Sequence, residues 1–387
     1  MEITQAETII IIAIGVLVAI QLLYTFVIYN APHRRVVAER KGKLPLSEQK
    51  PGISVVIAAA DCEQLLAKHL PLILEQEYPD FEVIVVDDNS QDETKELLQH
   101  LSERYPHLYT TFTSDSIRYI SHKKLALMLG IKAAKKEWVV FTEPDCYPTS
   151  RQWLASLARH FSDNTDVVLG YCNYERRRGF ANRCYMFDTL QQQLRLLGLT
   201  LRRGGYMGMG RNMAYRKEIF FANKGYSRHL DLERGEDDLF INEHVPSQRI
   251  TADVSALSVV RCTSANGHTW KRDKLSRLFI GRKMRGMQRQ LLGADTLSRT
   301  LLYAGATASI IVSLLMHWWI TLGITAGLWL ISIGCRLSVY HSISRDLGER
   351  RYLLSLPLFE ILQPCWELYF RICLLLTSKQ AHLRTKI

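Results

Sequence analysis

Short apolar runs alternate with amphipathic segments over the first half of the chain. The runs are rich in valine and isoleucine, and they fall at residues 53–60, 83–86, 138–142 and 167–171. Runs of this length are typical of parallel strands that are covered on both faces. The segments between them carry apolar residues at helical spacing and fall at residues 63–76, 94–105, 123–135 and 150–161. This alternation predicts an α/β domain whose mostly parallel sheet is flanked by helices.

The run at residues 83–86 ends in two carboxylates, Asp87 and Asp88. Ser90 follows in a position to cap a helix, and Glu93 completes a capping-box pattern with it. Charged side chains beyond the carboxyl end of a parallel strand lie where open α/β sheets bind ligands, although a merely solvated acidic pair gives the same pattern. The glycines of a P-loop or of a GxGxxG fingerprint do not follow, so neither phosphate motif is present.

Two more acidic groups stand at the ends of predicted elements. One is the Glu-Pro-Asp of residues 143–145, and the other is the Glu-Asp-Asp of residues 236–238, which opens a predicted helix. Carboxylates that converge at one edge of a sheet can hold a hard divalent cation, Mg²⁺ or Mn²⁺, together with the phosphate oxygens of a substrate. Such an arrangement suits the departure of a diphosphate and a general base that activates a hydroxyl.

Four stretches of the chain, in this order and at this spacing, resemble the motifs of family 2 glycosyltransferases. They are PGISVVIAAADCEQLLAKHLPLILEQEYPDFEVIVVDDNSQDET, FTEPDCYPTSRQWL, GYMGMGRNMAYRKEIF and GEDDLF. In order, they are similar to the family's N-terminal signature, its DxD region, the segment before its acceptor motif, and the (T/G)ED acceptor motif itself. The resemblance covers residues 52–277 and implies a GT-A fold. It also implies transfer with inversion from a nucleotide-diphosphate sugar, in a membrane-anchored bacterial enzyme of cell-envelope or exopolysaccharide synthesis.

At matching positions, the resemblance assigns the nucleoside to Asp61, Asp87 and Asp88. A strand-end carboxylate can accept an N–H of a uracil or guanine ring, so the role is chemically sensible. Lys123 falls where the family has a lysine that faces the donor diphosphate, and a compact ammonium suits that task. A solvated lysine at the start of a helix would give the same pattern.

The resemblance also implies a metal site and a base. Asp145 matches the last acid of the DxD motif, and Glu143 stands in place of the first. Asp237 matches the catalytic base, with Glu236 beside it as a substrate-binding acid, although helix capping also favours acids there. Arg277 can pair with the diphosphate, or it is one of many basic residues on an interfacial helix.

Two departures from the family pattern affect these assignments. The first DxD acid is a glutamate followed by a proline, so metal binding is expected to depend mainly on Asp145. The QxxRW motif of processive synthases is reduced to its arginine, Arg277, which argues against a chain-extruding synthase.

Apolar segments predict a membrane protein. Residues 9–27 carry no charge and, at about 20 residues, are long enough to span a bilayer. No basic region precedes them and no small-residue cleavage site follows, so we expect a retained anchor. The basic residues of 34–43 come next, and positive residues mark the cytoplasmic side. Residues 301–335 are long enough for two more spans, whereas polar residues interrupt 352–377 and favour a re-entrant or interfacial segment there.

Charge and cysteine usage exclude two other classes of site. The net charge of +11 comes largely from Lys and Arg beside the apolar segments, at residues 34–43, 271–289 and 345–351. This placement suits an anionic membrane face and argues against nucleic acid as a partner. The eight cysteines include no CxxC pair, so in a cytosolic domain we expect free thiols and no zinc site.

These observations divide the chain into six expected parts. They are an N-terminal transmembrane anchor (1–30), a basic cytoplasmic linker (31–51), a cytoplasmic GT-A domain (52–269), a basic interfacial segment (270–299), two transmembrane helices (300–341), and a basic loop with a re-entrant or interfacial segment and tail (342–387). We expect a multi-pass protein of the inner (plasma) membrane, with a nucleotide-diphosphate sugar as donor and a lipid-linked or glycan acceptor. Two alternatives stay open, a processive polysaccharide synthase and a catalytically silent membrane subunit that binds a nucleotide or glycan.

Overall fold

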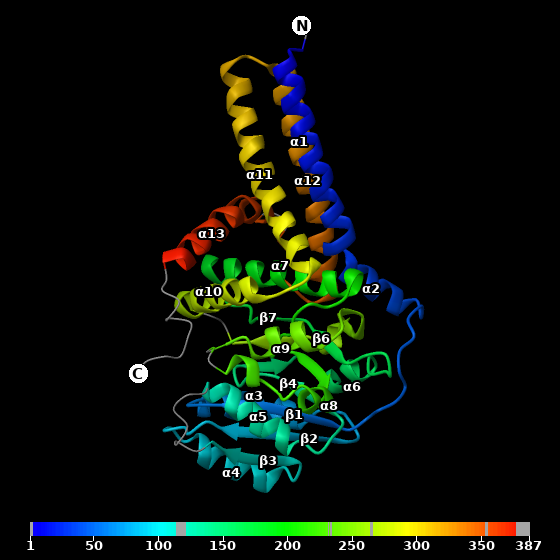
Figure 1. The fold of residues 1–387 in the computed structure, drawn as a ribbon, viewed down its shortest axis with the longest axis vertical. Coiled ribbons are helices and arrows are strands. Elements are labelled where there is room, and N and C mark those ends of the chain that lie inside the picture. The colour runs from blue at the N-terminus through cyan, green and yellow to red at the C-terminus, as the bar shows by residue number, and fades with distance from the viewer. Residues whose placement is uncertain are drawn as a thin grey trace.

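The computed structural model describes residues 3–113, 121–230, 232, 234–263, 266–352 and 355–376. An α/β domain forms one end of the molecule and a bundle of long helices forms the other (Figure 1). The helices between these two ends are α7 (Phe180–Arg203), α10 (Gly267–Lys283) and α13 (Leu356–Leu376). The arrangement places one side of the α/β domain directly beneath the bundle.

The α/β domain is built on a seven-stranded sheet with the order β3-β2-β1-β4-β8-β6-β9. Its strands are β1 (Ile53–Ala59), β2 (Phe81–Asp87), β3 (Leu108–Phe112), β4 (Trp138–Phe141), β6 (Val167–Gly170), β8 (Met213–Arg216) and β9 (Ile250–Asp253). Neighbouring strands run parallel except at β8, which is antiparallel to both β4 and β6. The predicted α/β class with a mostly parallel sheet is therefore confirmed.

Six helices of the described chain flank this sheet or lie at its edge. They are α3 (Glu63–Leu74), α4 (Thr94–Arg104), α5 (His122–Ala133), α6 (Trp153–Ala158), α8 (Lys217–Ala222) and α9 (Glu236–His244). Helix α5 lies against β1 and β2. Its Gly130 permits this approach, because a Cβ at that position would lie 2.5 Å from Cγ1 of Val56. The close contact fixes the first turn of α5 beside the carboxyl ends of both strands.

The helix after β2 does not begin where the sequence predicts. Helix α4 begins at Thr94 rather than after Ser90, and Glu93 precedes it without a side-chain cap. Ser90 instead accepts a hydrogen bond from the backbone N–H of Asp61 at 3.0 Å and donates its hydroxyl to Asp87. The capping-box prediction was wrong, because the serine hydroxyl joins the loops after β1 and β2.

A second sheet holds β5 (Cys146–Pro148), β10 (Val260–Cys262) and β7 (Cys172–Tyr174) in that order. Cys146 and Cys262 are directly opposite each other on antiparallel strands and form a disulfide. The expectation that every cysteine is a free thiol was wrong for this pair. Cys62, Cys172, Cys184, Cys335 and Cys365 are free thiols, as expected. Sequence spacing gave no sign of the disulfide, because its two cysteines are 116 residues apart.

Three helical stretches of the described chain are long and apolar enough to cross a membrane, at Gln5–Arg40, Met287–Leu315 and Trp319–Asp346. They correspond to α1 (Gln5–Leu23) with η1 (Tyr24–Tyr29) and α2 (Ala31–Arg40), to α11 (Met287–Leu315), and to α12 (Trp319–Asp346). The spans α1, α11 and α12 lie side by side, whereas α13 runs obliquely across the foot of this bundle (Figure 1).

A buried charge cluster joins the bundle to α7. The Asp295 carboxylate on α11 accepts a hydrogen bond from the Tyr29 hydroxyl at 2.7 Å. The same carboxylate pairs with Arg299 at 2.7 Å and with Arg195 of α7 at 3.0 Å. Arg195 also pairs with Glu367 of α13 at 3.3 Å. One carboxylate therefore holds cations from two helices at the junction between bundle and α/β domain.

Replacement of this carboxylate is expected to destabilise the protein. Asp295→Asn keeps the shape but leaves Arg195 and Arg299 buried with half of their negative partners removed, which should cost about 3 kcal/mol. For a chain of this size, that corresponds to a fall of roughly 4 °C in melting temperature, measured by fluorescence in detergent micelles. Glu75→Gln is the control, because Glu75 makes only exposed contacts, an ion pair with Arg151 and a hydrogen bond from the Tyr105 hydroxyl. It should change stability by less than about 1 kcal/mol. Equal melting temperatures for the two variants would contradict the role of Asp295.

Candidate active site

The carboxyl ends of β1, β2 and β4 meet at one edge of the sheet, because these neighbouring strands are parallel. The last residues of β1 and β2 are in register, with Ala59 beside Asp87. The backbone N–H of Asp88 donates to the carbonyl of Ala59 at 2.7 Å and continues this pairing beyond the strands. The three acids expected to contact a nucleoside, Asp61, Asp87 and Asp88, therefore lie together at this edge.

Each of these acids is held by its neighbours. Asp61 has a positive φ of 46°, and its Oδ1 accepts a hydrogen bond from the backbone N–H of Gln91 at 2.7 Å. Asp88 Oδ1 accepts from the Thr113 hydroxyl at 2.7 Å. Asp87 is buried and receives the hydroxyl of Ser90, whereas Asp61 is exposed and Asp88 is half-buried. The last two are thus the acids most accessible to a ligand.

The first turn of α5 connects these acids to a second charged group. His122 Nδ1 lies 3.2 Å from Asp88 Oδ1. The next residue, Lys123, directs its ammonium to Glu143 Oε1 at 2.6 Å and to Glu236 Oε1 at 3.0 Å. Because Glu143 follows β4 and Glu236 opens α9, Lys123 joins two motifs that are far apart in the sequence.

Glu143 lies between two cations, since Arg211 Nε approaches its other oxygen at 2.7 Å. Burial favours the neutral form of Glu143, but Lys123 and Arg211 outweigh it and hold the pKa well below its usual range. Burial also favours the neutral form of Glu236, but the Lys123 ammonium outweighs it and lowers the pKa of Glu236. Both carboxylates are therefore ionised, and Glu143 is occupied by side chains of the protein.

Asp145 is the carboxylate best suited to a metal ion. Among the described residues, no cationic side chain lies within 4.0 Å of it. Its ligand atoms and those of Glu143 and Cys146 lie within 4.8 Å of one another. Cys146 is tied to Cys262, and hard Mg²⁺ or Mn²⁺ prefers oxygen. Mg²⁺ is commonly coordinated by one or two protein carboxylates, with substrate phosphates filling the rest of its coordination shell. The residues present therefore fit such an ion.

Asp237 lies in the first turn of α9 and is buried. Burial and the neighbouring Glu236 carboxylate raise the pKa of Asp237 well above its ordinary value. Its Oδ1 is buried without a hydrogen-bond partner among the described residues. The loop before β8 closes on its other oxygen, because a Cβ at Gly210 would lie 2.0 Å from Asp237 Oδ2. A buried carboxylate with a spare acceptor atom is the expected form of a general base.

These groups line a small cavity of about 90 Å³. Of the residues predicted from sequence, the cavity brings together Lys123, Glu143, Glu236, Asp237 and Arg277. Asp145 lies outside its lining. So do the three acids expected to contact a nucleoside, which lie at the neighbouring strand ends.

Sequence reasoning missed three charged residues of this cavity. Arg211 pairs with Glu143 and also with Asp273 at 3.0 Å, and Arg234 pairs with the other oxygen of Asp273 at 2.6 Å. Arg211 follows the Gly-Met-Gly of a motif that was quoted without a role for the arginine. Asp273 is the single acid in the basic stretch 270–292, and an isolated acid of that kind is a signal that could have been used.

The chain is similar in sequence to known glycosyltransferases. Residues 54–221 match the family described as Glycosyl transferase family 2. A UDP-Glc:alpha-D-GlcNAc-diphosphoundecaprenol beta-1,3-glucosyltransferase of Escherichia coli is 24% identical over 128 residues, 33% of this chain and 48% of that protein. A GalNAc(5)-diNAcBac-PP-undecaprenol beta-1,3-glucosyltransferase of Campylobacter jejuni is 28% identical over 132 residues, 33% of this chain and 40% of that protein. The chain thus spans less than half the length of these relatives.

The fold has a counterpart among solved structures. A mannosyltransferase from Pyrobaculum calidifontis, in complex with GDP-Man and Mn²⁺, superposes with a TM-score of 0.50 at 19% identity. The match covers 91% of this chain and 99% of that one. The α/β domain is therefore of the GT-A type. The domain at residues 54–221 matches family 2 glycosyltransferases, in agreement with the motif resemblance.

The contact between Gly210 and Asp237 yields a sharp prediction. In Gly210→Ala, the added methyl must displace the Asp237 carboxylate, and misplacement of a catalytic group by about 1 Å can lower turnover about 100-fold. The measurement is nucleoside-diphosphate release from a nucleotide-sugar by purified protein. Gly323→Ala is the matched control, because nothing lies within 4 Å of a Cβ at that position. Similar turnover in both variants would show that the loop does not position Asp237.

Proposed function

We propose that this protein is an inverting glycosyltransferase that moves a sugar from a nucleotide-diphosphate sugar onto an acceptor hydroxyl presented at a membrane. The observation that carries the proposal is the buried Asp237 carboxylate. The Oδ1 atom of Asp237 has no hydrogen-bond partner among the described residues. Asp237 lines the smaller cavity together with Lys123, Arg211 and Arg277. A base beside a group of cations is what transfer to a hydroxyl with loss of a diphosphate requires.

The reaction follows from these positions. Asp237 takes the proton of the acceptor hydroxyl while the hydroxyl oxygen forms a bond to the anomeric carbon. The bond from that carbon to the diphosphate oxygen breaks on the opposite face, so the configuration inverts. Lys123, Arg211 and Arg277 lie where they can stabilise the negative charge of the leaving diphosphate. A divalent ion, Mg²⁺ or Mn²⁺, held by Asp145 would neutralise part of that charge when bound.

The nucleoside is assigned to the neighbouring strand ends. Asp61 and Asp88 are accessible there, and either carboxylate can accept an N–H of a uracil or guanine ring. His122 contacts Asp88, and Lys123 is the next residue of α5. These contacts support neighbouring positions for the nucleoside and the diphosphate. This spacing supports a nucleoside diphosphate lying along the carboxyl edge of the sheet.

The acceptor is proposed to be lipid-linked. Both curated relatives act, by name, on sugars attached to diphosphoundecaprenol, and three described helical stretches are candidates to span a membrane. The basic residues of 34–43 favour a cytoplasmic α/β domain in a multi-pass protein of the plasma membrane. A role in cell-envelope or exopolysaccharide synthesis follows from that acceptor class.

A donor panel tests the proposal. Purified protein in detergent is expected to release nucleoside diphosphate from one nucleotide-sugar when membrane extract and Mn²⁺ or Mg²⁺ are supplied, and EDTA should abolish the release. Asp237→Asn should lower the rate by at least about 100-fold, because general-base catalysis contributes about 10²–10⁴-fold. Asp163→Asn, at an exposed position, is the control. Nucleotide binding without turnover for every donor would instead favour a silent binding subunit, and long products would indicate a processive synthase.

The pH dependence of turnover gives a second test. Asp237 must be ionised to act as a base, so its raised pKa predicts a rate that increases with pH along an acid limb. Glu236→Gln removes a neighbouring negative charge, which lowers the pKa of Asp237 and moves the limb to lower pH. The limb position is read from nucleoside-diphosphate release at a series of pH values, with Glu75→Gln as a remote control. A limb that stays in place or moves to higher pH would exclude Asp237 as the group that titrates.

A further inference from the structure

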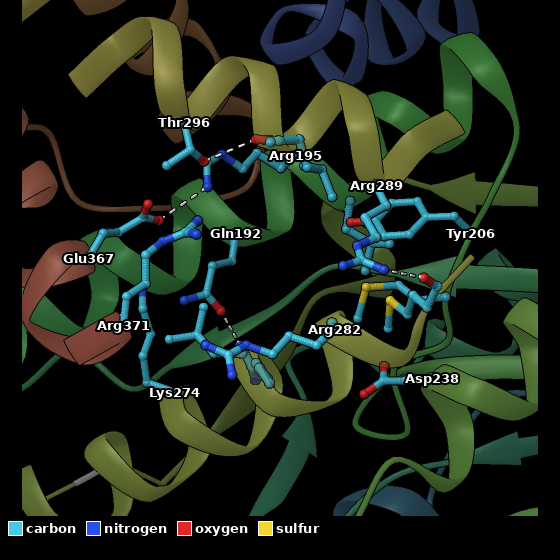
Figure 2. A pocket seen from close by; sticks show the side chains of 18 of the residues that line it. Gln192, Arg195, Tyr206, Asp238, Lys274, Arg282, Arg289, Thr296, Glu367 and Arg371 are labelled. Atoms are coloured by element: carbon cyan, nitrogen blue, oxygen red, sulfur yellow. Dashed lines mark hydrogen bonds and ion pairs between the residues drawn. The ribbon is translucent and has the colours of Figure 1, made fainter. Parts of the chain in front are cut away.

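A second and larger cavity, of about 450 Å³, adjoins the catalytic one. Helices α7, α10, α11 and α13 contribute to its walls, so it lies between the α/β domain and the foot of the bundle (Figures 1 and 2). The two cavities share Met207, Met209, Asp238 and Arg277 in their linings. Since Asp238 follows the proposed base directly, the larger cavity opens toward the reacting groups from the membrane side.

The charge of this cavity is strongly unbalanced. Its lining holds six basic side chains, Arg195, Lys274, Arg277, Arg282, Arg289 and Arg371. It holds only two acids, Asp238 and Glu367, and burial raises the pKa of Asp238 to about 7. Figure 2 shows Arg371 and Glu367 on one side of the cavity and Asp238 on the other.

Several of these cations are available to a ligand. Arg195 pairs with Asp295, and Lys274 pairs with Asp188. By contrast, no carboxylate of the described chain lies within 4.0 Å of Arg282 or Arg371, and both residues are exposed. Guanidinium groups bind phosphate oxygens through paired hydrogen bonds. The cavity therefore carries the charge of an anion site, with a phosphate group as the best match.

The rest of the lining is apolar and continues toward the bundle. Leu196, Leu278, Leu292 and Leu374 face the cavity between the cations. Farther along α11, on the membrane side of the cavity, leucines at 297 and 301 are 61% and 49% exposed. Helix α13 likewise exposes apolar side chains, including Leu375 at 72%. A ligand phosphate in the cavity can thus continue into a hydrocarbon chain that lies against these helices.

We propose that this cavity binds the phosphate or diphosphate group of the lipid-linked acceptor, with Arg282 and Arg371 as its principal anion-binding residues. The inference rests on the proposed function and adds to it the place of the acceptor headgroup. The lipid chain leaves along α11 and α13, and the acceptor sugar extends past Asp238 to Asp237. The donor enters from the carboxyl edge of the sheet, so the two substrates approach the base from different sides.

The test compares two double variants of the full chain in detergent. Arg282→Gln with Arg371→Gln removes the two cations proposed as the principal anion-binding residues of the cavity. Arg272→Gln with Arg202→Gln removes two exposed arginines of α10 and α7 that are outside its lining. The probe is farnesyl diphosphate, titrated by calorimetry with excess UDP and GDP present to occupy the donor site. The cavity variant should raise the dissociation constant at least about tenfold, or about 1.4 kcal/mol, whereas the control should match the unchanged protein.

Two further titrations identify the source of the phosphate. Inorganic diphosphate and farnesol are each expected to bind more weakly than farnesyl diphosphate. Inorganic diphosphate that binds as tightly as farnesyl diphosphate would overturn the lipid assignment. Equal effects of the two double variants, or no effect of either, would overturn the site itself. If the Gln variant fails to fold, two other double variants replace it. Arg282→Lys with Arg371→Lys keeps the charge and should retain most of the binding. Arg282→Met with Arg371→Met removes the charge and should bind farnesyl diphosphate more weakly than the Lys variant.

The test of the acceptor site and the test of the transferase can fail independently of each other. Donor turnover and its loss in Asp237→Asn report the transferase alone and require no prenyl probe. Turnover with unaltered probe binding in the cavity variant would refute the acceptor site and leave the transferase in place. Cavity-dependent probe binding without turnover from any donor would refute the transferase and leave the lipid-phosphate site.

Discussion

The Lys123 ammonium lies between two carboxylates that reach it from different parts of the chain, Glu143 after β4 and Glu236 at the start of α9. Buried ions of like sign repel each other, and the Lys123 ammonium offsets this repulsion and favours the ionised form of both acids. Arg211 adds a second cation to Glu143. This alternation of charges assembles the site, because it brings the strand-end acid and the helix that carries Asp237 to one place.

The same charge pattern separates the tasks of the acids. Glu143 and Glu236 are ionised and held by cations, whereas burial raises the pKa of Asp237. The Oδ1 of Asp237 also has no hydrogen-bond partner in the described part of the chain. Asp145 has no cation within pairing distance among the described residues. Four carboxylates of similar intrinsic acidity thus differ in role through their environment alone, which is the usual way in which a protein distinguishes bases from ligands.

The junction with the bundle repeats this principle on a larger scale. Asp295 holds Arg195 and Arg299 in a buried cluster that links α11 to α7. Helix α7 in turn forms one wall of the cationic cavity beside the active site. Because buried ion pairs require a defined geometry, they fix the orientation of the helix bundle relative to the α/β domain. The helix bundle and the α/β domain therefore meet in a single polar layer.

The sequence by itself determined the fold class and most of the candidate site residues, because strand periodicity and the acids at strand ends are local properties. Asp237, Asp145 and Lys123 were found through motifs of a few residues each. Tertiary structure alone decided the partners of those residues, since ion pairs and disulfides form between positions distant in the chain. The link between Cys146 and Cys262, the use of Ser90 as a bridge between loops rather than as a cap, and the capture of Arg211 by Asp273 all depend on which strands and helices become neighbours. Spacing along the chain cannot specify such contacts, because they arise only when the sheet order and the helix packing are set.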